Sequence, residues 1–347
     1  MVALRACISV GKVTDEPLLV CDDVRVVYPP RNRGAKAAHA VDGIDLDVRK
    51  GEIVALVGES GCGKTTLARA ILGLQAMSSG SIVFDAKPFP TGTADKKLFR
   101  RQAQIIFQDP TASLNPRHTV YEIVAEGLRI HGLAVDEHDV VVRALERCGL
   151  HPADQYLMKF PHELSGGQRQ RVVIAGAMVL EPKLLVADEP VSSLDASVRG
   201  EILALLQTLA REQAMAVLVV THDLGLAWNI ADRIAVMYLG RIVEMGATEE
   251  LLARPKHPYT RALLSVVREH RGMAKQILVG EMPDPTAIPP GCRFRQRCPL
   301  VQSGEAENLG IVPRCTSEDP VLLNHNDGVL VACHAAESSI TSAKFGG

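Results

Sequence analysis

The sequence lacks a long apolar run, since none of its hydrophobic stretches approaches the ~18 residues that a helix needs to span a bilayer. It also lacks a strong charge of either sign: the formal net charge at pH 7 is only −2. Bulk electrostatics therefore gives no reason to expect binding to nucleic acid or anionic lipid. The first residues, MVALRACISVGKV, contain no secretory segment because Arg5 interrupts the apolar residues. These absences predict a cytosolic protein, in which disulfides rarely persist.

Hydrophobic residues, by contrast, are plentiful enough for a large core. They make up 47% of the 347 residues, and a chain of this length favours two domains over one. Apolar stretches at residues 53–57 and 216–220 have the length of buried strands. From about residue 268 onward, proline-rich segments such as MPDPTAIPPGC predict a small appended domain or a loop-rich cap.

The strongest pattern is a glycine-rich loop, GESGCGKT, between the expected strand at 53–57 and an expected helix. It fits the GxxxxGK[ST] phosphate-binding pattern in its required setting of strand, loop and helix. Glycines let backbone N–H groups wrap phosphates, the lysine reaches the β- and γ-phosphates, and the threonine hydroxyl holds Mg²⁺. The alternative is a turn that only connects the strand to the helix. The helix is expected to bury Leu67, Ala70, Ile71 and Leu74 on one face. The expected ATP-binding residues are Gly58, Glu59, Ser60, Gly61, Cys62 (as a small filler), Gly63, Lys64, Thr65 and Thr66.

An acidic strand end complements this loop. The segment KLLVADEP, residues 183–190, predicts an apolar strand that ends at Asp188 and Glu189. Asp188 would orient the shell of the magnesium ion, and Glu189 would polarise the attacking water. Alone, such an acid pair could cap a helix or form a turn.

Between these two segments lies LSGGQ, residues 164–168, followed by an expected helix from residue 168 to 180. Ser165, Gly166, Gly167 and Gln168 predict a second anion site at a helix N-terminus, with no side chain in the way. Alone, SGG could be a turn before a helix. Together with the other two segments, it resembles the signature of ABC-transporter ATPases. The resemblance implies head-to-tail pairing of two ATPase domains, in which each signature covers the γ-phosphate bound by the other.

The same resemblance assigns roles to four more residues. It implies that Gln108, after an expected strand at 105–107, senses magnesium and water, and that Asp195 contacts the opposite subunit. It implies that His222, at the end of a third apolar strand, reaches the γ-phosphate, whereas a lone histidine is more often a packing residue. Tyr28 lies where the family has an aromatic ring stacked on adenine, although a tyrosine in a strand also serves packing alone.

Three segments narrow the family further: residues 108–120, residues 237–264 with HPYT at 257–260, and the tail that begins GCRF. They resemble the ATPase subunits of oligopeptide and dipeptide importers and of their nickel-importing relatives, and the resemblance runs from about residue 19 to 333. It implies a second, non-identical ATPase subunit, two transmembrane permease subunits, an extracytoplasmic substrate-binding protein and a place at the cytoplasmic face of the membrane. DNA-repair and ribosome-acting ABC proteins would need a long coiled coil, a zinc module or a second cassette, which this sequence lacks.

Four of the eight cysteines crowd into the tail, with the spacing C-x5-C-x16-C-x17-C. A short, loop-rich segment has little core of its own, so a metal could serve as a staple. The spacing alone leaves an iron–sulfur cluster, a zinc ion and free thiols open. The resemblance favours a [4Fe–4S] cluster on Cys292, Cys298, Cys315 and Cys333.

The sequence therefore predicts an α/β fold with a P-loop NTPase core, a mixed or parallel sheet and an N-terminal antiparallel β part. A helical subdomain at about 112–180 and a small loop-rich C-terminal domain complete it. The expected domains are an ABC ATPase domain at 18–267 and an importer-type extension with the cysteines at 268–347. The transported solute is not predictable, because this subunit would not touch it.

Overall fold

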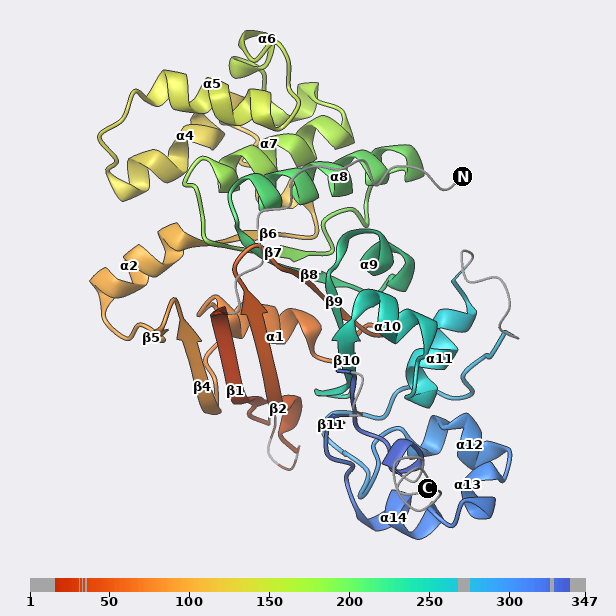
Figure 1. Ribbon diagram of the computed structural model, residues 1–347. Helices are drawn as coiled ribbons and strands as arrows, with labels where there is room; N and C mark the ends of the chain where they lie inside the picture. The colour runs from red at the N-terminus through yellow and green to blue at the C-terminus, as the bar shows by residue number, and fades with distance from the viewer. Residues whose placement is uncertain are drawn as a thin grey trace. The chain divides into compact units, whose positions relative to one another are not determined.

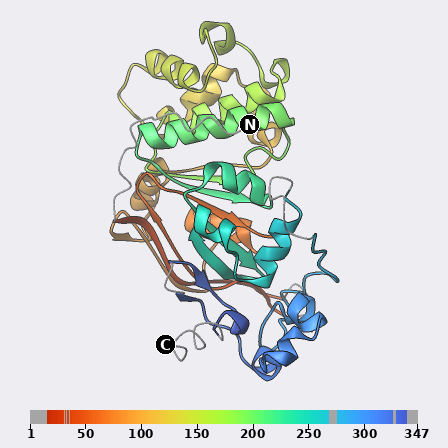
Figure 2. The ribbon, with the colours of Figure 1, turned by 45° about the vertical axis from the view of Figure 1, so that its right-hand side comes forward.

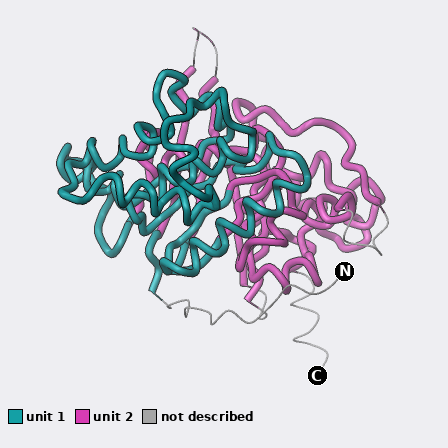
Figure 3. The backbone as a smooth tube through the Cα atoms, turned by 90° about the horizontal axis from the view of Figure 1, so that it is seen from above, with its two compact units in different colours: residues 1–19, 47–53, 83–219 teal, residues 20–46, 54–82, 220–347 magenta. Residues whose placement is uncertain are grey.

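The computed structural model describes residues 16–30, 32, 34, 36–267, 275–324 and 328–337. The chain folds as two compact units that alternate along the sequence (Figure 3). The first unit comprises residues 1–19, 47–53 and 83–219, and the second comprises residues 20–46, 54–82 and 220–347. The expectation for the N-terminal residues 1–13 lies outside the described residues, as does the start of the extension at residue 268. The two predicted domain boundaries stay predictions.

The second unit contains a sheet of parallel and antiparallel strands. β3 (Ile53–Val57) pairs in parallel with β9 (Arg233–Tyr238), which returns through a hairpin into β10 (Arg241–Ala247). On its other edge β10 pairs antiparallel with β12 (Leu330–Val331), and β12 pairs with β11 (Leu323–Asn324). The C-terminal extension therefore adds strands to the same sheet as β3. Every residue of β3 is buried, as expected of a continuous apolar run in a parallel sheet.

The N-terminal strands form a separate sheet. In the second unit β1 (Pro17–Tyr28) lies between β2 (Ala38–Arg49) and β4 (Ser79–Phe84). The last two residues of β4, in the first unit, pair antiparallel with β5 (Lys87–Pro88). Buried residues alternate with exposed ones along much of β1 and β2, the pattern of strands with one face on a core. The expected N-terminal β part is present.

The first unit combines a parallel sheet with a group of helices (Figures 1 and 2). β7 (Leu184–Asp188) is buried at every residue and lies between β6 (Ala103–Ile106), to which it pairs in parallel, and β8 (Ala216–Thr221). The helices are α2 (Thr93–Gln102), α3 (Pro110–Ser113), α4 (Val120–His131), α5 (Glu137–Arg147), α6 (Asp154–Leu157), η1 (Pro161–Glu163), α7 (Gly166–Met178) and α8 (Ala196–Glu212).

Local signals explain why helices fill the segment expected to be helical. Thr119 begins α4 with a capping box, in which Glu122 reaches back to the Thr119 N–H, and Gly132 ends it with φ 63°. The apolar face of α5 is buried at Val141 and Leu145. Both α4 and α5 pack against α7 and against each other, and Figure 1 labels the three helices.

The helices of the second unit follow its strands. They are α1 (Lys64–Ile71), α9 (Leu224–Ile230), α10 (Thr248–Ala253), α11 (Pro258–Ser265), η2 (Arg295–Arg297), α12 (Pro299–Gln302), α13 (Glu305–Asn308) and α14 (Val312–Ser317). One expectation was wrong: Leu74 does not share the buried face of α1, because the helix ends at Ile71 and Leu74 is 50% exposed. None of the helices in the described part of the chain has the length and apolar character needed to cross a membrane.

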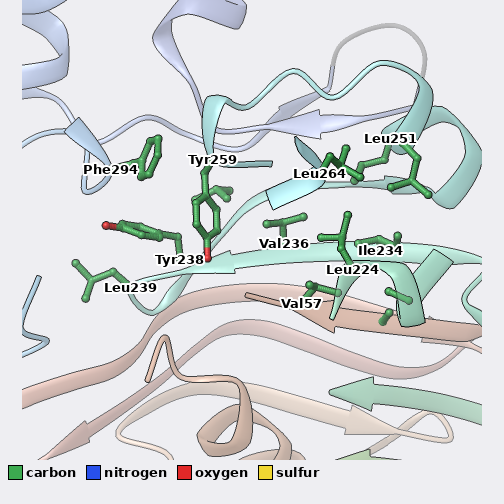
Figure 4. Packing of buried hydrophobic residues seen from close by; sticks show 14 of the residues in the cluster. Val57, Leu224, Ile234, Val236, Tyr238, Leu239, Leu251, Tyr259, Leu264 and Phe294 are labelled. Carbon is green, nitrogen blue, oxygen red and sulfur yellow. The ribbon is translucent and has the colours of Figure 1, made fainter. Parts of the chain in front are cut away.

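Aromatic rings join the C-terminal extension to the core of the second unit. Tyr238 at the end of β9 packs edge-on against Tyr259 of α11 and Phe294 of the extension, with ring centroids 4.9 and 5.2 Å away. Tyr259 and Phe294 are 5.3 Å apart. Figure 4 shows the three rings next to Leu239, in the same cluster as Val57 of β3 and Leu224 of α9. Because each ring buries a large apolar area, the extension is fixed to the sheet that carries β3.

Candidate functional site

The predicted phosphate loop lies between β3 and α1, in the second unit. Its glycines are required by close backbone packing: a Cβ on Gly58 would lie 2.2 Å from the carbonyl oxygen of Met237. A Cβ on Gly63 would lie 2.0 Å from that of Ala40, and Gly63 also has φ 109°. Gly63 is the N-cap of α1 and offers no side chain to cap it, so the helix N-terminus suits an anion.

Lys64 holds the loop in shape. Its ammonium group donates to the carbonyl oxygens of Gly58 at 2.8 Å and Glu59 at 2.9 Å, and the side chain is buried. The hydroxyl of Tyr28 lies 3.4 Å from that of Thr66, which follows Thr65 on α1. The structure thus brings Tyr28 beside the loop, with its hydroxyl toward the helix that carries the threonines, and its stacking on adenine stays a prediction.

Cys62 lies inside the loop as a buried side chain. Burial raises the pKa of its thiol above the ordinary value. This shift favours the neutral thiol, and the role of Cys62 as a filler stays a prediction. The backbone of Cys62 is held by two hydrogen bonds: its N–H donates to the carbonyl oxygen of Glu59 at 3.4 Å, and the N–H of Gly240 donates to the Cys62 carbonyl oxygen at 2.9 Å.

The acid pair ends β7 in the first unit, as predicted. Asp188 is buried and is the last residue of the strand. Glu189 follows with φ 51°, a left-handed conformation that a residue other than glycine rarely adopts. Its carbonyl oxygen accepts from the N–H and the hydroxyl of Ser192, which closes a turn directly after the acid. Backbone strain of this kind concentrates at functional sites.

The LSGGQ segment begins α7, also in the first unit. Ser165 caps the helix by accepting from the N–H of Gln168, whose side-chain oxygen accepts from the N–H of Ser165 at 2.9 Å. The helix begins at Gly166, two residues before the predicted start. A Cβ on Gly167 would lie 2.8 Å from a methyl group of Val198 on α8, so close helix packing requires the glycine. Ser165 itself is exposed.

The remaining predicted residues all lie at element ends. Gln108 follows β6, Asp195 is the N-cap position of α8, and His222 follows β8; all three are exposed. The Asp195 carboxylate makes no capping hydrogen bond to its own helix. Gln108, Glu189 and Asp195 belong to the first unit, whereas His222 belongs to the unit of the phosphate loop.

The four cysteines of the extension line one pocket, although they come from well-separated positions in the sequence. Each is a free thiol, and the N–H of Cys292 donates to the carbonyl oxygen of Cys315 at 2.9 Å. Burial, with the neighbouring sulfurs of Cys333, Cys315 and Cys298, raises the pKa of Cys292 to about 12. Within the residues that the structure describes, no group of three or more His, Cys, Asp or Glu side chains is arranged to hold a metal, so the structure does not support the expected cluster.

Sequence reasoning missed two residues that contact the phosphate loop from the extension side. Tyr259 accepts a hydrogen bond from the N–H of Glu59 at 2.9 Å. Arg297 donates to both carboxylate oxygens of Glu59, at 3.0 and 3.2 Å. Two features of the sequence contain these residues: the HPYT segment and the arginines between the first two cysteines of the tail. By themselves, these features indicate only the family.

Family models match two parts of the chain. The model described as ABC transporter matches residues 41–192. The model described as oligopeptide/dipeptide transporter, C-terminal region, matches residues 243–304. The first range contains the loop, the signature and the acid pair, and the second contains Tyr259, Arg297 and two of the pocket cysteines.

Similar proteins cover nearly the whole chain. A putative peptide import ATP-binding protein of Brucella ovis is 41% identical over 327 residues, which are 92% of this chain and 98% of that protein. The oligopeptide transport ATP-binding protein OppF of Salmonella typhimurium is 43% identical over 296 residues, 83% of this chain and 85% of that protein.

Solved structures share the fold. The cbiO1 protein of Clostridium perfringens, described as part of an ABC transporter complex, has a TM-score of 0.61 and 31% identity, and covers 69% of this chain and 92% of its own. The ATP-binding cassette MJ0796, solved as a dimer with ADP and Pi, has a TM-score of 0.59 and 27% identity, and covers 66% and 98%. The chain therefore belongs to the ATP-hydrolysing subunits of ABC transporters, in the branch that carries the oligopeptide and dipeptide transporter C-terminal region.

Proposed function

We propose that this chain binds MgATP at residues 58–66 and hydrolyses it to drive import of oligopeptides or dipeptides through membrane subunits. One observation carries the proposal: a preformed phosphate loop held by Lys64 occurs in one chain with the C-terminal region of peptide transporters. The names of the similar proteins from Brucella and Salmonella support the same solute class.

The proposed binding roles follow from charge and position. The Lys64 ammonium group, which the carbonyl oxygens of Gly58 and Glu59 hold in place, has three N–H donors and donates to phosphate oxygens, a more favourable partner for a cation. The backbone N–H groups from Gly61 to Thr66 receive the remaining phosphate charge at the helix N-terminus. Thr65 and Gln108 are the residues that would hold magnesium, Asp188 would orient the shell of the ion, and the ion would neutralise charge on the phosphates.

The proposed hydrolysis relies on Glu189 and His222, and adenine binding relies on Tyr28. Glu189 takes a proton from the attacking water, and the turn at Ser192 keeps its backbone in the left-handed conformation that aims the side chain. His222, exposed after β8, contacts the γ-phosphate. Tyr28 stacks on adenine while its hydroxyl stays beside Thr66.

The signature is proposed to act in a dimer. Ser165, Gly166, Gly167 and Gln168 cover the γ-phosphate of a second ATPase subunit, and Asp195 contacts that subunit. Ser165 is exposed, and the Asp195 carboxylate makes no capping hydrogen bond to α8; both observations support this role. The similar cassette MJ0796, which was solved as a dimer, supports it as well.

Further partners belong to the same proposal. The second ATPase subunit is a non-identical chain, and the pair binds two transmembrane permease subunits at the cytoplasmic face of the membrane. An extracytoplasmic protein delivers the solute. Nucleic acid is no partner, in keeping with the net charge of −2.

The solute class is tested by ATPase stimulation in the assembled transporter in lipid vesicles. Peptide-loaded binding protein is expected to raise the ATPase rate several-fold, because loaded receptor favours the closed ATPase dimer. Nickel, DNA and ribosomes, supplied in parallel, are expected to leave the rate unchanged. Stimulation by any of these three without peptide would refute peptide import.

We further propose that the four pocket cysteines hold a [4Fe–4S] cluster, which would staple a loop-rich extension together. Four thiols around one apolar pocket are the ligand number and type that such a cluster takes.

Metal analysis of anaerobically purified protein tests the cluster. About four iron and four sulfide per chain are expected, with visible absorbance that a Cys298→Ser variant loses. A Cys148→Ser variant is the matched control, since Cys148 is also a buried thiol but lies at the end of α5 in the first unit. A colourless preparation with four titratable thiols, or one that holds zinc, would overturn the assignment.

A further inference from the structure

Glu59, the second residue of the phosphate loop, is held by the C-terminal part of the chain through both its backbone and its side chain. The Tyr259 hydroxyl accepts from its N–H at 2.9 Å, across 200 residues of sequence. Arg297 donates to its carboxylate at 3.0 and 3.2 Å, across 238 residues. Two separate groups of the extension side thus fix one residue of the loop.

The backbone contact orients the peptide unit between Gly58 and Glu59. In a trans peptide the C=O and N–H groups point in opposite directions. The N–H of this unit points to Tyr259, so its carbonyl oxygen points the other way, to the ammonium group of Lys64 at 2.8 Å. Tyr259 therefore sets the direction of a carbonyl that places the phosphate-binding lysine.

The side-chain contact controls charge beside the loop. The side chain of Arg297 is only 7% exposed, whereas that of Glu59 is 30% exposed. The guanidinium lies 5.9 Å over the ring of Tyr238, which packs against Tyr259. Without this arginine, an uncompensated carboxylate would lie in the segment that receives the phosphates and would repel them.

Both contacts arise from segments that shape the cysteine pocket. Arg297 directly precedes Cys298, and His257, two residues before Tyr259, lines the pocket beside Phe294. His257 accepts from the N–H of Tyr259 through its ring nitrogen at 3.0 Å and so fixes the start of α11. The pocket and the phosphate loop are joined by these few side chains.

We propose that Tyr259 of α11 and Arg297 of the C-terminal extension are positioning residues for the phosphate loop, so that both segments are part of the ATP-binding machinery. Neither residue touches the reacting atoms; both act through Glu59. The inference rests on ATP binding at residues 58–66, and it makes the extension a determinant of nucleotide affinity and not of the hydrolytic step.

The test measures ATP affinity by fluorescent-nucleotide binding, and KM and kcat, on the full chain. Tyr259→Phe removes one hydrogen bond and is expected to raise the Kd for ATP about five-fold. Arg297→Gln is expected to raise the Kd for ATP about ten-fold. The rise in the Kd for ADP should be smaller, because the Glu59 carboxylate then repels fewer phosphate charges. In both variants kcat should stay within about two-fold of wild type, because the residues that activate water are unchanged.

A rescue separates this role from simple loss of folding. Adding Glu59→Gln to Arg297→Gln removes the uncompensated carboxylate and is expected to return the Kd to within about three-fold of wild type. Arg295→Gln and Tyr121→Phe are matched controls. Arg295 bonds the carbonyl oxygens of Cys315 and Thr316, the hydroxyl of Tyr121 donates to Glu137 at 2.8 Å, and neither touches the loop.

The outcomes distinguish this inference from the proposed function. If wild-type protein binds ATP and all variants bind it equally well, the positioning role is refuted while the ATPase stands. If Arg295→Gln weakens binding as much as Arg297→Gln, or if the double variant is not rescued, Arg297 supports folding only and the inference is overturned. If wild-type protein binds no ATP, the proposed function itself is lost.

Discussion

A Glu189→Gln variant is expected to bind ATP like wild-type protein and to hydrolyse it about 10³-fold more slowly. The amide keeps the shape of the side chain but cannot accept the proton of the attacking water. The backbone requirement at φ 51° is the same for both residues, so the turn after β7 should persist. Phosphate release under single-turnover conditions, alongside equilibrium binding of ATP, measures the two effects separately.

Glu181→Gln is the matched control for that experiment. Glu181 is also a glutamate with a left-handed backbone, φ 50°, but it is exposed and precedes β7, whereas Glu189 follows it. Its variant should hydrolyse ATP at the wild-type rate. Hydrolysis by Glu189→Gln at a near-normal rate would show that another residue activates the water.

The second large effect concerns binding. Lys64→Ala is expected to weaken ATP binding about 100-fold, because it removes the charge-assisted contacts of the ammonium group to the phosphates. The same change frees the carbonyl oxygens of Gly58 and Glu59, which adds disorder to the loop. Calorimetric titration with ATP measures the loss, and thermal unfolding without nucleotide measures any accompanying loss of stability.

Lys183→Ala provides the comparison for Lys64→Ala. Lys183 forms an ion pair with Asp85, with 45% and 29% of the two side chains exposed, and an exposed pair contributes little. ATP affinity should therefore stay at the wild-type value in this variant. Tight ATP binding by Lys64→Ala would contradict the assignment of residues 58–66 as the phosphate site.

Features that depend on neighbours in sequence were predictable from the sequence. The apolar run at 53–57 became β3, and the run at 183–190 became β7 with Asp188 at its end. The SGGQ segment became a capped helix start, because Ser165 and Gln168 are three residues apart and bond each other. Each of these outcomes rests on local hydrogen bonding and hydrophobic patterning.

Features that depend on distant contacts were not predictable in the same way. Nothing near Glu59 in the sequence shows that Tyr259 and Arg297 hold it, because these contacts exist only once β9, α11 and the extension have packed together. For the same reason, nothing in the proline-rich tail predicted that β12 pairs with β10 in the sheet that contains β3. The hydrophobic periodicity also predicted a helix that reaches Leu74, whereas α1 ends at Ile71. Periodicity alone does not show the turn at Gly73, where φ is 65°.

Uptake of labelled peptide into lipid vesicles most directly tests the claim that ATP hydrolysis by this chain powers peptide import. The vesicles would carry this subunit, its ATPase partner and the permeases, with ATP on the side of the ATPases and peptide-loaded binding protein on the other. Wild-type protein is predicted to accumulate peptide only with ATP, and the Glu189→Gln variant is predicted to accumulate none. Peptide uptake that continues without ATP, or that is unchanged in Glu189→Gln, would contradict the account.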